Sequence, residues 1–339
     1  MVKVDDMMKK ILYFSIALLT VSCQHEVAYD VDYNVTLDAS NTYYAGDPVR
    51  FNIKGEVDNI TFYSGEMGSQ YIYKDRFSVP VESVRSAELR LQIQPQWGYN
   101  GGFDIYVTDS FEGLLGNDGE ADRATMRSMY EAGMQGWTKV EWADPQGAGA
   151  GSAEAWIDVN VPMSDYIDNA VVAFHFHPKR DGVSAQRSYG LKGGVSLDME
   201  GIPPVNLDLV DLGFTVVNMN EEVGAYDINI PNTPGGNTYN GRIRFDYHQA
   251  PIFFNGAGAT ALEYAIDSWC ISNPAALNRV TNDKGVAIKN MQNYLSHYEY
   301  VFNEPGTYEV TFVGINSNYA MHQKKVKTLR VTILENLND

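Results

Sequence analysis

The chain has 339 residues, and its 43 Asp and Glu against 25 Lys and Arg give a formal net charge of −18. A body this acidic repels nucleic acid and anionic membrane surfaces, so nucleic acid is excluded as an expected partner. Aromatic residues make up 12% of the chain and Gly occurs 30 times, a composition that favours strands and turns over helices.

The N-terminal residues predict an export signal. Met7-Met8-Lys9-Lys10 is a basic head, the run from Ile11 to Val21 carries no charge, and Ser22 precedes Cys23. This order is that of a secretory signal, and the apolar run is shorter than the roughly 20 residues that cross a bilayer. Residues 1–22 are therefore expected to be a signal peptide and residues 23–33 a tether.

Leu19-Thr20-Val21-Ser22-Cys23 resembles a bacterial lipobox. The resemblance implies cleavage before Cys23 and lipidation of its sulfur, which would anchor the chain to a membrane. An ordinary secretory signal with a chance cysteine is the alternative. If Cys23 carries lipid, Cys270 has no partner and the fold uses no internal disulfide.

Alternating strand patterns begin directly after the tether. Gly46-Asp47-Pro48-Val49-Arg50-Phe51 and Asn59 to Glu66 resemble the first half of a polycystic-kidney-disease (PKD) type Ig-like domain. The string from Tyr298 to Phe312, with Pro305-Gly306-Thr307-Tyr308 at its centre, resembles the second half. Neither half could bury its apolar face alone. Residues 34–80 and 292–335 are therefore predicted to form one split PKD/Ig-like sandwich.

Residues 81–291 are predicted to be an insertion, which is tolerable because the ends of a domain often lie close together. Strand patterns separated by Gly and Asn loops run through it, and only Asp122 to Met134 has helical character. Many strands with long loops predict a jelly-roll-like sandwich. The strings Ile105 to Gly113, Asn169 to Phe174 and Asp267 to Ser272 resemble galactose-binding-type sandwiches, in an order that indicates permutation. The expected fold class is all-β.

Signal, tether, split domain and insert together resemble Bacteroidales surface lipoproteins that carry an uncharacterised domain and occur in polysaccharide-utilisation loci. The resemblance implies a non-catalytic glycan-binding lipoprotein, held by its lipid in the outer membrane at the cell surface. Its implied partners are an oligosaccharide or polysaccharide and an outer-membrane glycan importer. A cell-surface adhesin or structural protein is one alternative, and a carbohydrate-active hydrolase is the second.

The expected sugar site lies in the loop Trp97-Gly98-Tyr99-Asn100-Gly101-Gly102. Sugar rings bind through exposed aromatic faces and fixed hydrogen-bonding groups, so Trp97 and Tyr99 are expected to stack while Asn100 and Asp104 bond hydroxyls. The alternative is that Trp97 folds back to cap the edge of the sandwich. By strand alternation Trp156 is expected in the core, and Trp269 is expected there too.

Metal and catalytic chemistry are weakly indicated. His175 and His177 share one face of a strand whose other face carries Phe174 and Phe176, and two imidazoles at this spacing could ligate zinc. No third histidine or cysteine accompanies them at a recognisable spacing, so a solvated strand face is expected and no metal. Asp104, Asp109, Asp118 and Asp122 are an alternative calcium set. No spacing selects a catalytic pair, so no catalytic residue and no cofactor are expected.

Overall fold

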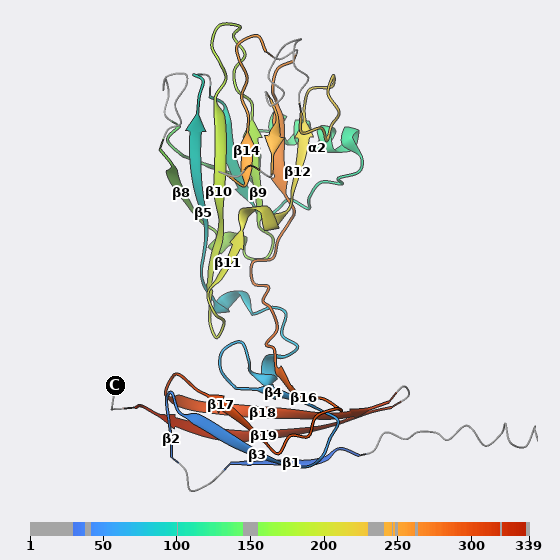
Figure 1. The fold of residues 1–339 in the computed structure, drawn as a ribbon. Coiled ribbons are helices and arrows are strands. Elements are labelled where there is room, and N and C mark those ends of the chain that lie inside the picture. Colours follow the sequence, from blue (N-terminus) through green and yellow to red (C-terminus); the bar gives the residue numbers. More distant parts are fainter. Residues whose placement is uncertain are drawn as a thin grey trace, which may run out of the picture. The chain divides into compact units, whose positions relative to one another are not determined.

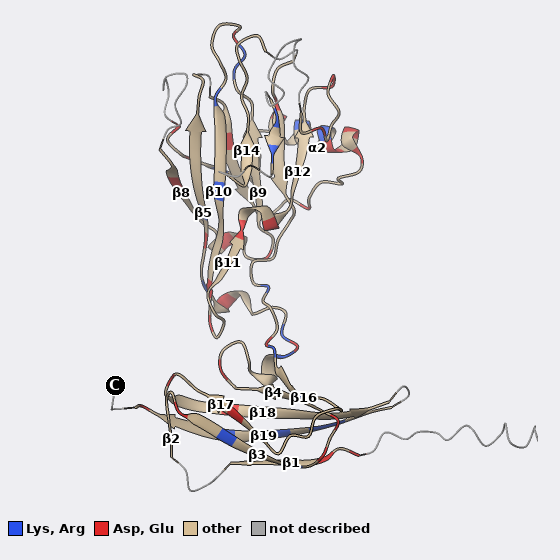
Figure 2. Ribbon diagram, in the orientation of Figure 1, with Lys and Arg blue, Asp and Glu red and all other residues tan. Residues whose placement is uncertain are grey.

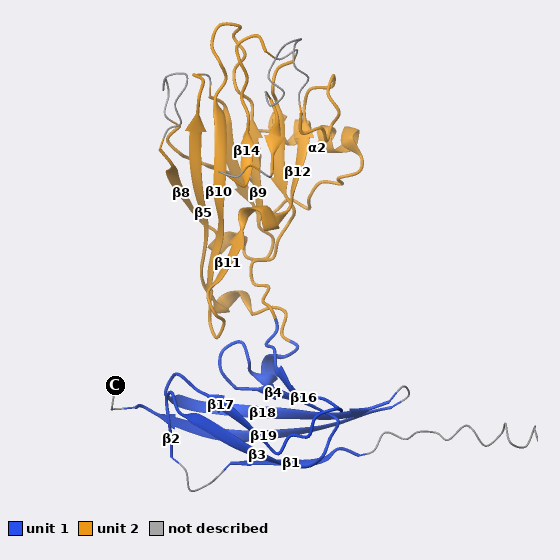
Figure 3. Ribbon diagram, in the orientation of Figure 1, with its two compact units in different colours: residues 1–75, 282–339 blue, residues 76–281 orange. Residues whose placement is uncertain are grey.

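The chain divides into two compact units, coloured separately in Figure 3. The terminal unit comprises residues 1–75 and 282–339, and the inserted unit comprises residues 76–281. The computed structural model describes residues 30–37, 42–99, 101–144, 155–229, 241–245, 247, 250–261, 264–318 and 321–336.

The terminal unit consists of two sheets that share one core (Figure 1). One sheet has the order β1-β3-β17, and the other has the order β16-β4-β18-β19-β2. The strands are β1 (Asp32–Leu37), β2 (Tyr43–Tyr44), β3 (Pro48–Glu56), β4 (Asn59–Tyr63), β16 (Val286–Lys289), β17 (His297–Val301), β18 (Gly306–Ser317) and β19 (His322–Leu334). A short 3-10 helix, η1, spans Tyr71–Tyr73.

Strands from the two ends of the chain complete each other. β17 pairs antiparallel with β3, and β18 pairs antiparallel with β4. Between the sheets the Phe312 ring lies 5.2 Å from the rings of both Phe51 and Phe62. β3 and β4 thus each pair with a strand from the C-terminal segment, and Tyr63 lies 248 positions before its partner Thr311.

The unit boundaries differ from the expected ones at 80/81 and 291/292. β16 pairs with β4, so residues 282–291 belong to the terminal unit. Val79 joins the core of the inserted unit, where its N–H and the Asn278 carbonyl are 3.0 Å apart, so residues 76–80 belong there. Backbone pairing, which the strand patterns alone do not display, sets both boundaries.

Tyr33 shows how closely the two sheets of the terminal unit approach. Its hydroxyl donates to the Phe312 carbonyl at 2.8 Å, and burial raises the pKa of Tyr33 to about 12. The ring lies over Gly314, where an added Cβ would stand 2.3 Å from it. Glycine is therefore required at this position because any side chain would strike the tyrosine.

The inserted unit also has two sheets around a core. The β5 sheet has the order β13-β14-β10-β5-β8 with β11 paired to β10, and the β9 sheet has the order β12-β15-β9-β6-β7. Their strands are β5 (Val84–Gln96), β6 (Phe103–Thr108), β7 (Thr138–Val140), β8 (Ile157–Pro162), β9 (Val171–Phe176), β10 (Ser188–Met199), β11 (Val205–Asp208), β12 (Phe214–Asn218), β13 (Ile243–Arg244), β14 (Ile252–Phe254) and β15 (Ser268–Ser272). The short helices are η2 (Val81–Ser83), η3 (Ser164–Tyr166) and η4 (Leu209–Leu212).

One α-helix, α2 (Gly119–Glu131), occurs in the described part of the chain. It begins three residues before the expected Asp122, because the Asp118 side chain caps it by accepting the Ala121 N–H at 3.1 Å. Met126 of α2 packs with Tyr106 and Trp269 on the outer face of the β9 sheet. That face is therefore covered by the helix, while the opposite face of the same sheet forms the main core.

The prediction of an all-β, sandwich-like fold is confirmed, since strands supply nearly all of the regular structure in both units (Figure 1). Among the described residues no helix has the length and apolar character needed to cross a membrane.

Candidate functional site

The two aromatic residues of the predicted sugar site are held outward by a pinned loop. Trp97 and Tyr99 follow the end of β5, and each is 44% exposed. The Tyr99 N–H donates to the Ala185 carbonyl at 2.8 Å, and a Cβ on Gly98 would lie 2.2 Å from the Gln186 oxygen. Trp97 adopts a positive φ of 46°, which is uncommon for a residue other than glycine. The backbone is thus tied to residues 185–187 while both rings reach solvent.

A buried arginine supports this loop from beneath. Arg187 is buried, and its guanidinium donates to the Gly98 carbonyl and to the Asp144 carboxylate, both at 3.4 Å. The Tyr189 hydroxyl donates to the other Asp144 oxygen at 2.6 Å. Burial raises the pKa of Asp144, although the bonds from Tyr189 and Arg187 oppose the rise. This network fixes the end of the sandwich from which Trp97 and Tyr99 project.

Trp97 is part of a row of aromatic rings on the outer face of the β5 sheet. Ile252 and Phe254 of β14 join the core, so Phe253 between them points outward. The Phe253 ring centroid lies 6.3 Å from that of Trp97 and 4.6 Å from that of Tyr247. The Arg244 guanidinium lies 4.5 Å from the centre of the Tyr247 ring.

Polar side chains continue the same face along β5 and β8. The Gln92 side chain donates to Asp158 at 2.8 Å, from strands that pair in register. Lys192 of β10 lies 4.1 Å from the centre of the Trp156 ring. The prediction that Trp156 lies in the core is wrong: it is only partly buried and stands on this outer face. Alternation along β8 gives the inward positions to Ile157, Val159 and Val161.

A groove of about 510 Å³ opens on this face between β5, β10 and β11. Its floor contains Gly193 and Gly194, where an added Cβ would lie 2.0 Å from the Arg90 oxygen and 1.9 Å from the Leu207 oxygen respectively. A side chain at either position would strike the backbone of the neighbouring strand, so both positions require glycine. The polar lining residues are Arg90, Gln92, Lys192, Ser196, Asn206 and Asp208.

Asp104 does not lie with Trp97 and Tyr99, contrary to the prediction. It stands on β6 of the β9 sheet, where its carboxylate lies 3.1 Å from His177 Nε2 and accepts a bond from Lys139 Nζ at 2.8 Å. Burial alone would raise the pKa of Asp104, but the bonds and charges of His177 and Lys139 outweigh it and hold that pKa at about 2. Asn100 and Cys23 lie outside the described residues.

His175 is buried, contrary to the prediction of a solvated face for both histidines. It is 2% exposed because α2 and Trp269 cover it, whereas the side chain of His177 is 34% exposed. The His175 and Trp269 rings stack at 4.0 Å and 4°, and Tyr130 of α2 meets His175 edge-on at 5.1 Å. Phe174 and Phe176 take the core face, as alternation predicts.

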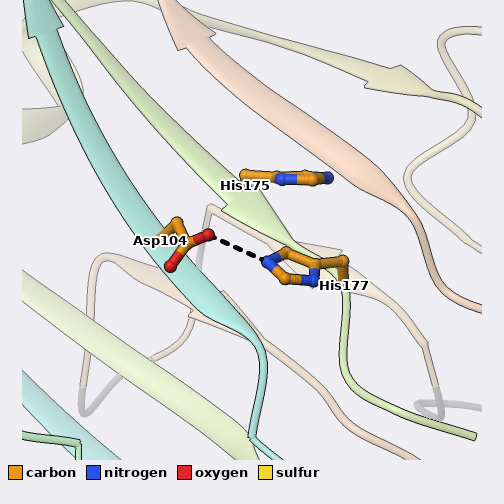
Figure 4. A group of neighbouring side chains, drawn as sticks. All are labelled: Asp104, His175 and His177. Atoms are coloured by element: carbon orange, nitrogen blue, oxygen red, sulfur yellow. Dashed lines mark hydrogen bonds and ion pairs between the residues drawn. The ribbon is translucent and has the colours of Figure 1, made fainter. Parts of the chain in front are cut away.

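The structure brings together Asp104, His175 and His177, drawn in Figure 4. Asp104 and His175 are direct partners across the β6–β9 ladder, and His177 follows two residues later on the same face. The three ligating atoms lie within 4.8 Å of one another, and no other such group of three occurs in the described ranges. The sequence shows the two histidines, but the carboxylate comes from another strand and no spacing links it to them.

The alternative calcium set is not assembled as a site. Asp118 caps α2, and the buried Asp122 carboxylate accepts bonds from the N–H groups of Leu115 and Gly116, both at 2.9 Å, and from the Tyr226 hydroxyl at 2.6 Å. The Asp122 carboxylate oxygens therefore already accept hydrogen bonds that hold the loop before α2. Acidic and basic residues are otherwise scattered over both units (Figure 2).

Comparison with protein families gives one match. Residues 22–132 match a domain of unknown function, DUF5017. This DUF5017 region starts one residue before Cys23, continues through β1–β6 into the inserted unit, and ends directly after α2. It includes Trp97, Tyr99 and Asp104 but neither histidine of the cluster. No curated protein matches the chain, and no solved structure matches it, so the PKD-like and galactose-binding-like resemblances stay predictions.

Proposed function

We propose that the chain is a non-catalytic glycan-binding lipoprotein that captures an oligosaccharide or polysaccharide on the outer face of the β5 sheet. The supporting observations are the Trp97 ring, which is 44% exposed and lies beside the buried Phe253, and the groove with polar lining residues on the outer face of the same sheet. An exposed aromatic ring and a polar groove therefore belong to the same sheet and its adjoining loop.

This surface offers both kinds of contact that a sugar needs. The C–H faces of a pyranose pack on an exposed aromatic ring, and its hydroxyls exchange hydrogen bonds with planar amide and charged groups. Trp97 and Trp156 supply rings, while Gln92 and Asp158 supply a fixed donor–acceptor pair. Gln92 and Asp158 lie on paired strands, which hold them more firmly than a loop would.

The first test removes one ring. Trp97→Ala in the chain starting at residue 24 is expected to weaken binding of a glycan identified on an array by at least about tenfold, since a stacked ring contributes on the order of 1–3 kcal/mol. The melting temperature is expected to change little because the ring is half exposed, whereas truncating a buried Trp costs about 3–5 kcal/mol.

The matched control is Tyr294→Ala, which removes an aromatic ring that is 86% exposed in the terminal unit. It is expected to leave both affinity and stability unchanged. Unchanged glycan affinity in Trp97→Ala would place the sugar site elsewhere, and a large loss of stability would show that Trp97 is a structural residue.

The proposed location is the outer membrane at the cell surface, beside a glycan importer, with the lipid on Cys23 as the anchor. The support is the lipobox-like string Leu19 to Cys23 and the basic, then apolar, residues before it. Two or more acyl chains anchor a protein stably. Expression with labelled palmitate in a Gram-negative host is expected to label the wild-type chain and not Cys23→Ala. A Cys23→Ala chain that stays equally bound to membranes would contradict the anchor.

A further inference from the structure

The outer face of the β9 sheet carries a row of side chains that differs from its apolar surroundings. Trp269, His175 and Asp104 are aligned in register across β15, β9 and β6, and His177 lies beside Asp104 (Figure 4). Most of their neighbours on this face are apolar residues packed under α2, such as Val171 and Ile271. A polar group of this kind under a helix requires a partner for each buried polar atom.

His175 has one nitrogen that lacks such a partner. Its Nε2 lies 2.8 Å from the Asp267 carboxylate, while its buried Nδ1 makes no hydrogen bond to any described residue. A carboxylate accepts and does not donate, so Nε2 carries the proton and Nδ1 of the neutral ring keeps a free lone pair.

This arrangement is the one that metal-binding histidines use. A ligating imidazole commonly donates its second N–H to a carboxylate, which fixes the ring and makes the free nitrogen more basic. Asp267 plays that part for His175, and the stacked Trp269 ring holds the imidazole in place. His175, His177 and Asp104 each offer one ligand atom, and these three atoms lie within 4.8 Å of one another.

We propose that Asp104, His175 and His177 bind a divalent transition-metal ion, with zinc as the probe. Two imidazole nitrogens and one carboxylate oxygen are a ligand set that such ions accept, at about 2.0–2.2 Å each. Two atoms at that distance from one ion are at most about 4.4 Å apart. Rotation of the partly exposed His177 side chain would bring its nitrogen from the present separation of up to 4.8 Å to within that limit. The fourth coordination position of the ion would then face solvent.

Lys139 is the internal competitor for this ion. Its ammonium lies 2.8 Å from the Asp104 carboxylate. The positive charge of Lys139 repels a metal ion that binds the same carboxylate. The Lys139 side chain is 47% exposed, so it can leave Asp104 for water without a buried charge being stranded. Removing the lysine charge is therefore expected to tighten metal binding, an effect that a purely structural role of the cluster would not produce.

The experiment is titration of the metal-free chain with Zn²⁺ by calorimetry, and with Co²⁺ by visible absorption. One saturable site is expected, weakened at least about tenfold by Asp104→Asn, by His177→Ala and by Asp267→Asn, and tightened at least about threefold by Lys139→Gln. The control His297→Ala, which removes a histidine of the terminal unit, is expected to bind as the wild type does.

Three results would overturn the proposal: absence of saturable binding, binding that the cluster variants leave unchanged, or binding lost in His297→Ala. Circular dichroism checks that each variant is folded. Even if Asp104→Asn or His177→Ala unfolded the unit, the gain expected for Lys139→Gln keeps the test decisive. Because the cluster lies on the β9 sheet and the proposed sugar surface on the β5 sheet, Zn²⁺ binding and glycan binding fail or succeed separately.

Discussion

Val331→Asp is expected to unfold the terminal unit, including N-terminal strands that lie far from it in sequence. Val331 of β19 is 1% exposed and belongs to the core that also contains Phe51 and Phe62. Burying a carboxylate without a partner costs several kcal/mol. The total free energy of unfolding of a domain is on the order of 5–15 kcal/mol, so this cost is a large fraction of it. Hydrogen exchange of the β3 and β4 amides is expected to lose its protection, while exchange in the inserted unit stays slow.

Thr332→Asp is the matched control, because it places the same charge on the next residue of β19, which faces solvent. It is expected to change the stability by less than about 0.5 kcal/mol. If Val331→Asp left β3 and β4 as protected as in the wild type, the two ends of the chain would not share one core. Equal loss in both variants would point to β19 pairing, not core burial, as the cause.

Arg123→Met is expected to destabilise the inserted unit by about 3 kcal/mol, because several buried carbonyls lose their donor together. The Arg123 guanidinium, 5% exposed, donates to the carbonyls of Asn218 at 2.7 Å, Asn220 at 3.0 Å and Val223. These bonds tie α2 to the last residue of β12 and to the chain that follows it, so their loss is expected to loosen the helix that covers the outer face of the β9 sheet. Urea unfolding followed by tryptophan fluorescence measures the change.

Arg127→Met is the control for this substitution, one turn further along α2. Arg127 bonds only Glu221 among the described residues, at 2.9 Å, and both side chains are largely exposed. Exposed ion pairs contribute about 0–1 kcal/mol, so the urea midpoint is expected to move little. A similar shift in both variants would mean that helix propensity or net charge, and not the buried carbonyls, is responsible.

The residue pattern is sufficient for the fold class and for much of the strand layout. Side chains alternate across a strand, so the sequence around Val49 and around Phe174 already separates core positions from their neighbours. It also indicates that the segments near residues 50 and 310 need each other, because each has one apolar face and too few strands to cover it. The structure places strands from both segments in both sheets of the terminal unit.

The alternation of side chains along a strand does not indicate whether the face opposite the core is exposed to solvent or covered by another element. The sequence predicts His175 in solvent because it lies opposite the core, but α2 packs on that second face and buries it. The helix comes from residues more than 40 positions earlier, as Met126 shows, and no local pattern links it to β9. Burial of the histidine, and with it the unpaired Nδ1, is a tertiary property.

Membership of a site is likewise set by which strands become neighbours. Trp97 and Asp104 are close in sequence, yet the loop between them crosses from the β5 sheet to the β9 sheet and separates their side chains. Asp104 instead meets His175, 71 residues later, because β6 and β9 pair in that register. Sequence composition determines that this chain forms sandwiches with exposed aromatic rings, whereas strand pairing determines which polar groups meet, since pairing joins residues that share no local pattern.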